Sequence, residues 1–192
     1  MYRAVTLKVL QSGIALKDEA GIASLVATTH VELRKSGSLV KVLLDGRDVT
    51  GDIRSVEVTK AVSRVSSLRC VREAMVREQR RMGAEGGIVL EGRDIGTVVF
   101  PDAELKFFVI AGIDARAKRR QAEFRSKGVE ANIEELLKDI EERDAFDSAR
   151  SESPLRRAKD AIDLDTSDMT IEQQVEFVVH RVKEKMELQG KT

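Results

Sequence analysis

An apolar run that ends in charged residues and glycines is the first feature with possible chemistry. Residues 88–101 read IVLEGRDIGTVVFP, in which Arg93 and Asp94 lie between two glycines. The carboxyl end of a buried parallel strand has this character where it opens onto a ligand. The guanidinium of Arg93 can bind a phosphate, the carboxylate of Asp94 can accept hydrogen bonds or bind a metal, and the glycines allow close approach of the backbone. A charged small-molecule substrate is expected; the alternative is a solvated turn after a strand.

Five further arginines could bind a polyphosphate. Three of them are spaced three and four residues apart and can share one face of a helix: Arg116, Arg119 and Arg120. Arg143 and Arg150 flank mostly small or acidic residues, Asp147 among them, which suits a mobile lid. Arginine charge that stabilises a transferring phosphoryl group is worth about 10³ to 10⁵ in rate. The alternative is that these arginines are solvated surface charges paired with Glu or Asp.

The elements that must position these residues alternate between strand and helix. Patterning predicts strands at 88–91, 104–110 and 161–165, and a helix from 114 to 127 that Gly128 closes. This order indicates an α/β fold with a parallel sheet. Arg93 and Asp94 would then lie at the carboxyl end of the first of these strands.

Four further segments are predicted to be helical, and one stretch has β character. The predicted helices cover 4–16 with an end near Gly13, 55–82 as two helices or one bent near residues 66–67, 133 to about 143, and a last helix capped by Thr170 and Gln173. Between about 26 and 54, alternating residues, a break at 36–38 and a turn at Asp45 and Gly46 predict an antiparallel meander. The polar stretch 144–153 is predicted to be a loop.

The composition indicates one globular domain and argues against several classes of protein. The 192 residues, 42% of them hydrophobic, are enough for one core. Lys plus Arg and Asp plus Glu each number 33, and 4% of residues are aromatic, so nucleic acid and anionic membranes are not expected partners. The sequence shows neither a signal peptide nor an 18-residue apolar run, which predicts a cytoplasmic location. The single cysteine, Cys70, is interpreted as a structural thiol rather than a nucleophile.

Four segments together resemble bacterial cytidylate kinases. They are IVLEGRDIGTVVFPD at 88–102, DGRDVT at 45–50 followed by Ile53 and Arg54, VREA at 71–74, and ERD at 142–144. Their order and spacing match over essentially all 192 residues. The resemblance implies transfer of the γ-phosphoryl group of ATP, with Mg²⁺, to CMP or dCMP by a monomeric enzyme.

The same resemblance implies an architecture and a set of site residues. The fold would be a P-loop nucleoside monophosphate kinase-like parallel sheet with flanking helices, incomplete at the N-terminus, with a small antiparallel CMP-binding insert at 26–64 and a lid at 143–157. The resemblance implies that Ser63, Arg72 and Asp94 contact the cytosine edge and that Arg3 and Arg93 bind the CMP phosphate. It implies that Arg143, Asp147 and Arg150 of the lid contact sugar and phosphates. The donor nucleotide is assigned to Arg116, Arg119 and Arg120. Cytosine presents an amine that needs an acceptor and a carbonyl and N3 that need donors, so these residue types suit it. No residue is assigned to the metal.

One part of the family pattern has no counterpart in this sequence. Such a kinase should begin with a strand and a glycine-rich P-loop that ends in Gly-Lys-Ser/Thr and holds the ATP phosphates. The similar triplet at 190–192 lacks the upstream glycine, because Lys185 occupies its place. We expect the P-loop segment to be missing because the start is misplaced at Met1, rather than through genuine truncation. Without the P-loop strand, the strands at 88–91 and 104–110 would lose the neighbour that they share in the sheet, and we expect poor stability as a consequence. An enzyme completed by a longer chain and an inactive CMP-binding fragment both remain open.

Overall fold

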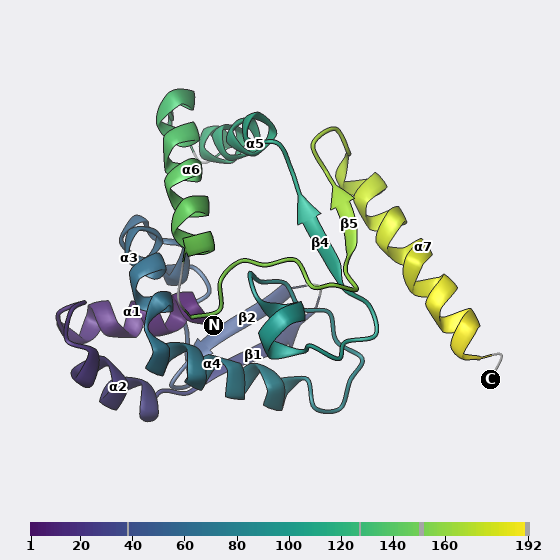
Figure 1. Cartoon of the computed structure of the whole chain (residues 1–192). Coiled ribbons are helices and arrows are strands. Elements are labelled where there is room, and N and C mark those ends of the chain that lie inside the picture. Colours follow the sequence, from purple (N-terminus) through teal and green to yellow (C-terminus); the bar gives the residue numbers. More distant parts are fainter. Residues whose placement is uncertain (38, 127, 150–151, 191–192) are drawn as a thin grey trace. The chain divides into compact units, whose positions relative to one another are not determined.

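The computed structural model describes residues 1–37, 39–126, 128–149 and 152–190 (Figure 1). The chain separates into two compact units, which we call the first and the second unit. The first comprises Met1–Gly92 with Arg150–Pro154, and the second comprises Arg93–Ala149 with Leu155–Thr192. The single domain predicted over residues 1–192, with its insert and lid, remains a prediction.

The first unit combines helices with an antiparallel sheet. Its helices are α1 (Tyr2–Ser12), α2 (Glu19–Ala27), α3 (Val56–Ser67) and α4 (Arg69–Met82), and a 3₁₀ turn covers Asp52–Arg54. Its strands are β1 (Val31–Ser36), β2 (Leu39–Leu44) and β3 (Arg47–Asp48). The predicted end of the first helix near Gly13 is confirmed, because Gly13 takes the left-handed conformation (φ 69°) that closes α1.

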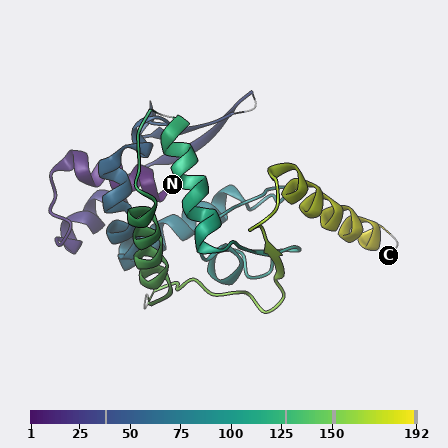
Figure 2. The same ribbon diagram turned by 90° about the horizontal axis from the view of Figure 1, so that it is seen from above.

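The predicted meander is an antiparallel sheet in the order β1-β2-β3. β1 and β2 pair along their whole length, beginning with Val31 opposite Leu44, and Figure 2 shows their hairpin extending from the helices of this unit. Asp45 and Gly46 have φ angles of 49° and 84° and form the tight turn from β2 to β3. Asp45 also pairs with Lys8 of α1 at 2.6 Å, so this turn is anchored to the helices.

α3 and α4 are separate helices that meet at the break predicted near residues 66–67. Leu68 lies between them in an extended conformation (φ −70°, ψ 129°), so the chain changes direction there. The apolar faces of the helices and the sheet enclose one core, whose most deeply buried members include Val5, Val58, Val71 and Met75. This core fixes the helices that carry Arg3, Ser63 and Arg72.

Met75 allows a test of this core. Its side chain is 1% exposed, so its truncation to alanine would leave a cavity. We expect Met75→Ala to lower the free energy of unfolding by about 2–5 kcal/mol. Arg77→Ala, on the exposed face of the same helix, should change it by less than about 0.5 kcal/mol. Urea denaturation measures both values, and equal losses would show that α4 does not pack in this core.

The second unit contains a parallel pair of strands with flanking helices. Its strands are β4 (Phe107–Ile110) and β5 (Ile162–Asp165), its helices are α5 (Ile113–Ser126), α6 (Ile133–Ala149) and α7 (Ile171–Gln189), and a π-helical turn covers Ile95–Val99. In the parallel register Phe107 is opposite Ile162 and Ile110 is opposite Asp165. The predicted α/β class is confirmed: a parallel sheet, flanking helices and a small antiparallel sheet are all present.

The strand predicted at 88–91 is wrong. These residues have no regular structure, follow two glycines with φ angles of 71° and 64°, and pair with no strand in the part of the chain that the structure describes. Because a strand is stabilised by hydrogen bonds to a neighbour, an apolar run does not define one by itself. Val89 is accordingly 97% exposed. Arg93 and Asp94 therefore follow an irregular segment rather than a strand.

α5 and α6 pack against each other and carry many of the predicted site residues. Their buried contacts are made by Ala117, Leu136 and Ile140. α6 is longer than the helix predicted over 133–143, because it continues to Ala149. Most of the predicted loop at 144–153 is therefore helical, and Arg143 and Asp147 lie on one continuous helix.

α7 begins with the predicted capping box. The hydroxyl of Thr170 accepts a hydrogen bond from the backbone N of Gln173 at 3.3 Å, and the side chain of Gln173 accepts one from the backbone N of Thr170 at 2.9 Å. Phe177 packs edge to face on Phe107 of β4, with ring centroids 6.3 Å apart. Exposed apolar residues on α7 include Ile171, Val175, Val179, Val182 and Met186. Despite these residues, none of the helices described here has the length and apolar character of a membrane span.

A salt bridge before the two parallel strands makes stability depend on pH. Nζ of Lys106, which precedes β4, lies 2.7 Å from Oδ2 of Asp160, which precedes β5. The hydrogen bond from Lys106 holds the pKa of Asp160 below its ordinary value. Because the folded-state pKa is lowered, the stabilisation by this carboxylate is fully present above about pH 4, and it is lost as the pH falls through the folded-state value.

We therefore expect acid to destabilise the wild type more steeply than Asp160→Asn. Urea denaturation between about pH 5 and about pH 2 gives the free energy of unfolding at each pH, and the gap between the two proteins should close as the pH falls. Asp139→Asn, which removes an exposed carboxylate from α6, should follow the wild type more closely. A constant gap between wild type and Asp160→Asn would contradict the assigned role of Asp160.

Candidate functional site

Arg3 of α1 is held by acceptors of its own unit. Its Nη1 donates hydrogen bonds to the carbonyl oxygen of Ile53 and to Oγ1 of Thr59, both at 3.0 Å. Thr59 belongs to α3, so Arg3 connects the beginning of α1 to a second helix. The position of this guanidinium is therefore set by the fold.

Ser63 and Arg72 are connected through one intermediate residue. The guanidinium of Arg72 is buried in α4; its Nη1 donates to the carbonyl oxygen of Ser66 at 3.1 Å, and its Cζ lies 5.4 Å from the ring centroid of Tyr2. Ser66 in turn donates from Oγ to the carbonyl oxygen of Ser63 at 3.2 Å. A cation beside an aromatic face is stabilised where water is excluded. The structure thus places Ser63 and Arg72 on two successive helices of the first unit, and these hydrogen bonds reach only the backbone of Ser63.

Asp147 is the centre of an ion-pair cluster in the second unit. Its Oδ2 lies 3.2 Å from Nε of Arg93 and 3.9 Å from Nε of Arg143. The carboxylate is 1% exposed, whereas each arginine side chain is 39% exposed. A buried carboxylate is costly unless nearby cations compensate for the lost water, and two guanidiniums lie within ion-pair distance of it. The cluster therefore places two guanidinium groups beside one buried anion.

Asp94 follows Arg93 directly and begins the π-helical turn Ile95–Val99. Its side chain is buried, and its carbonyl oxygen accepts hydrogen bonds from the backbone N atoms of Thr97 (3.3 Å) and Val98 (2.9 Å). The turn fixes the backbone of Asp94, and with it the direction in which Arg93 leaves the chain. The predicted pair at 93–94 is thus positioned by a helical turn rather than by a strand end.

The three arginines of α5 have different surroundings. Arg119 donates from Nη1 to Oγ1 of Thr166 at 3.2 Å and from Nη2 to the carbonyl oxygen of the same residue, which follows β5. Arg120 lies over the ring of Phe124, with 5.7 Å between Cζ and the centroid. Arg116 pairs with a carboxylate of α6. The three side chains share a helix but contact three different groups.

Asp144 is a residue of this region that the sequence reasoning missed. Its Oδ2 lies 2.6 Å from Nη1 of Arg116, with both side chains about one-third exposed. One signal could have identified it: Asp144 lies three residues before Asp147, so a helix through this stretch places both carboxylates on adjacent positions of one face. The prediction of a loop here removed that signal.

Arg150, the remaining lid residue, lies outside the described residues. The part of the predicted lid that is described consists of the end of α6 and an irregular segment after residue 151. The backbone N of Leu155 donates to the carbonyl oxygen of Asp147 at 3.0 Å, so this segment returns to α6. A lid function for 143–157 stays a prediction.

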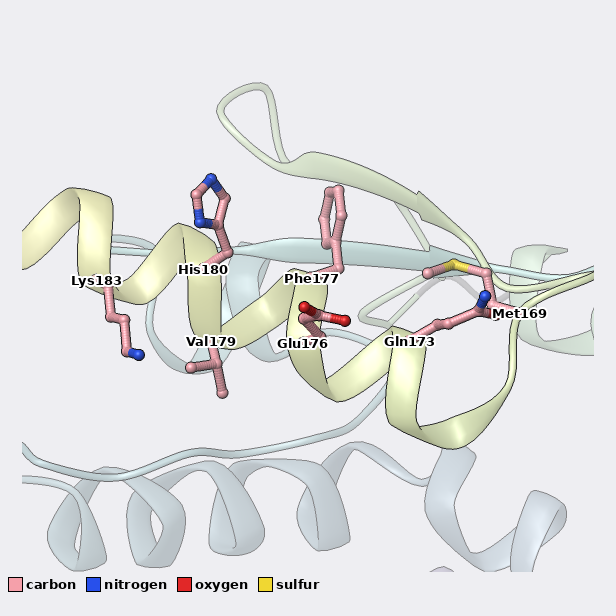
Figure 3. A pocket seen from close by; sticks show the side chains of 7 residues that line it. All are labelled: Met169, Gln173, Glu176, Phe177, Val179, His180 and Lys183. Carbon is pink, nitrogen blue, oxygen red and sulfur yellow. The ribbon is translucent and has the colours of Figure 1, made fainter.

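An open depression of about 450 Å³ lies along α7 and contains none of the predicted site residues. Figure 3 shows side chains at its lining, among them Phe177, His180 and Lys183. His180 also lies 3.3 Å from Glu184 on the same helix, which is ordinary surface pairing. Within the described parts of the chain, no group of three or more His, Cys, Asp or Glu residues is arranged to hold a metal ion. The charged cluster around Asp147 is therefore the stronger candidate site.

Known proteins resemble this chain over most of its length. A family model described as cytidylate kinase matches residues 1–184. The cytidylate kinase of Bacillus pumilus (strain SAFR-032) is 47% identical over 173 residues, which cover 90% of this chain and 77% of that protein. The cytidylate kinase of Geobacillus sp. (strain WCH70) is 46% identical over 97% of this chain and 83% of its own length. A bifunctional pantoate ligase/cytidylate kinase of Trichormus variabilis (strain ATCC 29413 / PCC 7937) is 50% identical, and the matched part is 33% of that protein.

Proposed function

The chain belongs to the cytidylate kinase family of phosphotransferases, which use ATP as phosphate donor, and from this premise we propose that it transfers the γ-phosphoryl group to CMP or dCMP. The observation that carries the proposal is the ion-pair cluster of Asp147 with Arg93 and Arg143. Phosphoryl transfer depends on positioned positive charge more than on covalent chemistry. Two arginines oriented by one buried carboxylate supply such charge.

Recognition of the cytosine base is assigned to Ser63, Arg72 and Asp94. The carboxylate of Asp94 and the hydroxyl of Ser63 can accept hydrogen bonds from the exocyclic amine, and the guanidinium of Arg72 can donate to the ring carbonyl and N3. Arg72 suits this task because the Ser66 carbonyl and the Tyr2 ring restrict its orientation. A preorganised donor loses less conformational entropy on binding.

The phosphates are assigned mainly to arginines. Arg3 and Arg93 would hold the CMP phosphate, and Arg143, Asp147 and Arg150 would contact sugar and phosphates. On the donor side, Arg116, Arg119 and Arg120 of α5 would bind the ATP phosphates. ATP carries adjacent negative charges that such guanidiniums can neutralise.

Mg²⁺, a cytoplasmic location and a monomeric state complete the proposal. Mg²⁺ would be bound mainly by the ATP phosphates and water, as is usual for this ion. A balanced charge and the low aromatic content support small-molecule nucleotides rather than nucleic acid as partners. A second candidate function is binding of CMP without phosphoryl transfer.

Calorimetric titration with CMP and with Mg·ATP, combined with an assay of CMP-dependent ADP formation, tests both candidates. Binding of both nucleotides with ADP formation is the result expected for the kinase. CMP binding without ADP formation would favour the second candidate. If CMP fails to bind to a protein that shows a cooperative thermal transition, the assigned acceptor residues are wrong.

Asp94 provides the specificity test. We expect Asp94→Asn to lower the ratio of CMP to UMP affinity by about 10- to 100-fold, because an asparagine amide can donate to the uracil carbonyl that replaces the cytosine amine. Asp102→Asn removes an exposed carboxylate of the same unit and should leave the ratio unchanged. Titration of each variant with CMP and UMP measures the ratio. An unaltered ratio for Asp94→Asn would exclude a role in base recognition.

A further inference from the structure

The α5–α6 pair contains an ion pair that the assignments above do not use. Nη1 of Arg116 in α5 and Oδ2 of Asp144 in α6 are 2.6 Å apart, and the side chains are 35% and 32% exposed. This is short for an ion pair at a partly exposed site, where many such pairs are loose. The contact therefore restricts an otherwise flexible side chain.

Asp144 and Asp147 form a row of two carboxylates on α6. They are three residues apart, which places them on the same face of the helix. Asp147 holds Arg93 and Arg143, and Asp144 holds Arg116. One helix face thus orients guanidiniums from the segment before the π-helical turn, from α6 and from α5.

The geometry points to Asp144 as a positioning residue that orients Arg116 for the phosphates of the donor nucleotide. This inference rests on the proposed function, because it takes ATP as the ligand of Arg116. A guanidinium has five N–H donors on three nitrogens, and the observed ion pair is made at one terminal nitrogen. A second edge of the fork can then meet a phosphate while the first edge remains on the carboxylate.

The surroundings of the other arginines of α5 show why this one needs a positioning partner. Arg119 is fixed by two oxygens of Thr166, and Arg120 lies over Phe124. Arg116 lies in the first turn of α5, and the carboxylate of Asp144, on the neighbouring helix α6, pairs with it. A negative charge so close to a phosphate site opposes ATP binding by long-range repulsion, but this repulsion is weak at a partly exposed position in water. The gain from a fixed guanidinium should exceed it.

Removal of the carboxylate tests the inference. We expect Asp144→Asn to weaken Mg·ATP binding about tenfold in calorimetric titration, and to raise the KM for ATP similarly, while CMP affinity changes by less than about twofold. Glu141→Gln removes an exposed charge from the same helix and should alter neither affinity. ATP binding by Asp144→Asn that equals or exceeds that of the wild type would overturn the inference, because the carboxylate would then be neutral or a competitor of the phosphate.

A charge-swapped double variant shows whether Asp144 orients Arg116 for ATP or only stabilises the packing of α5 on α6. Arg116→Asp with Asp144→Arg keeps an ion pair between α5 and α6 but places the guanidinium on the wrong helix. We expect the double variant to have the thermal stability of the wild type but a lower affinity for ATP. Recovery of ATP affinity by the swap would overturn the inference. Absence of ATP binding by the wild type would also overturn it, whereas the separate CMP titration still decides the acceptor part of the proposed function.

Discussion

Replacement of Arg93 by methionine should weaken CMP binding by about 100-fold and leave the binding of cytidine unchanged. Methionine keeps most of the length and apolar contact of the side chain and removes its charge. A hydrogen bond to a charged group is worth about 1.5–3 kcal/mol, and a bidentate contact to the CMP phosphate would contain two of them. Cytidine lacks the phosphate, so it reports on the rest of the acceptor site. Turnover should fall further, by about 10³, because the Arg93 guanidinium would no longer stabilise the negative charge of the transferring phosphoryl group.

Calorimetric titration of both ligands against wild type and variant gives the comparison. Arg125→Met removes an exposed arginine from α5 in the same unit and controls for the loss of overall charge. A parallel loss of CMP and cytidine affinity would indicate that Arg93→Met disturbs the fold around Asp147 rather than a phosphate contact. Unchanged CMP affinity would remove Arg93 from the phosphate site.

Features of the first unit could be predicted because their signals are local. The turn at Asp45 and Gly46 requires positive φ angles that this dipeptide adopts readily, and the alternation on either side sets the register of the strands. The break between α3 and α4 was marked by two serines in a row at 66–67. Such signals depend on neighbours in sequence, so one sequence is enough to interpret them.

Two errors concern elements that depend on distant partners. The run at 88–91 has the composition of a buried strand, but no strand pairs with it in the described residues, and composition carries no information about a partner. The end of α6 is polar and was predicted as a loop. It remains helical while Asp147 contacts Arg93, a residue far away in the sequence. Tertiary contacts of this kind override local propensity.

The site was predictable in its residue types but not in its pairings. The spacing of charged and glycine residues pointed to Arg93 and Arg143, and the resemblance to the family implied a role for Asp147; the roles of all three stay predictions. That both arginines lie on one carboxylate oxygen, and that Asp144 holds Arg116, follows from helix packing and side-chain rotamers. Sequence spacing shows which residues can share a face, and packing decides which of them meet.

Replacement of Asp147 by asparagine should reduce both stability and CMP affinity, because this carboxylate is nearly inaccessible and faces two cations. Breaking a fully buried ion pair costs about 3–5 kcal/mol, but the side chains of Arg93 and Arg143 are 39% exposed, so water can replace part of the lost contact. We expect the free energy of unfolding to fall by about 1–3 kcal/mol. Urea denaturation measures this loss, and Asp139→Asn, exposed on the same helix, should cost less than about 0.5 kcal/mol.

The nucleotide titrations of Asp147→Asn show whether Asp147 acts on the ligand or only through Arg93. A carboxylate that contacts the sugar should be felt by CMP and cytidine alike, with about a tenfold loss for each. If Asp147 only orients Arg93, its replacement should weaken CMP binding and spare cytidine binding, which is the pattern expected for Arg93→Met. The double variant Arg93→Met with Asp147→Asn separates the two roles. If both substitutions remove one shared contact, their losses of binding free energy do not add; if they remove independent contacts, the losses add to within about 0.5 kcal/mol. We expect Asp147→Asn to lower the affinity for cytidine, because Asp147 is assigned to the sugar. We also expect the losses of CMP binding free energy to be partly additive in the double variant, because Asp147 is close enough to Arg93 to orient it. Full CMP affinity in Asp147→Asn would contradict both roles.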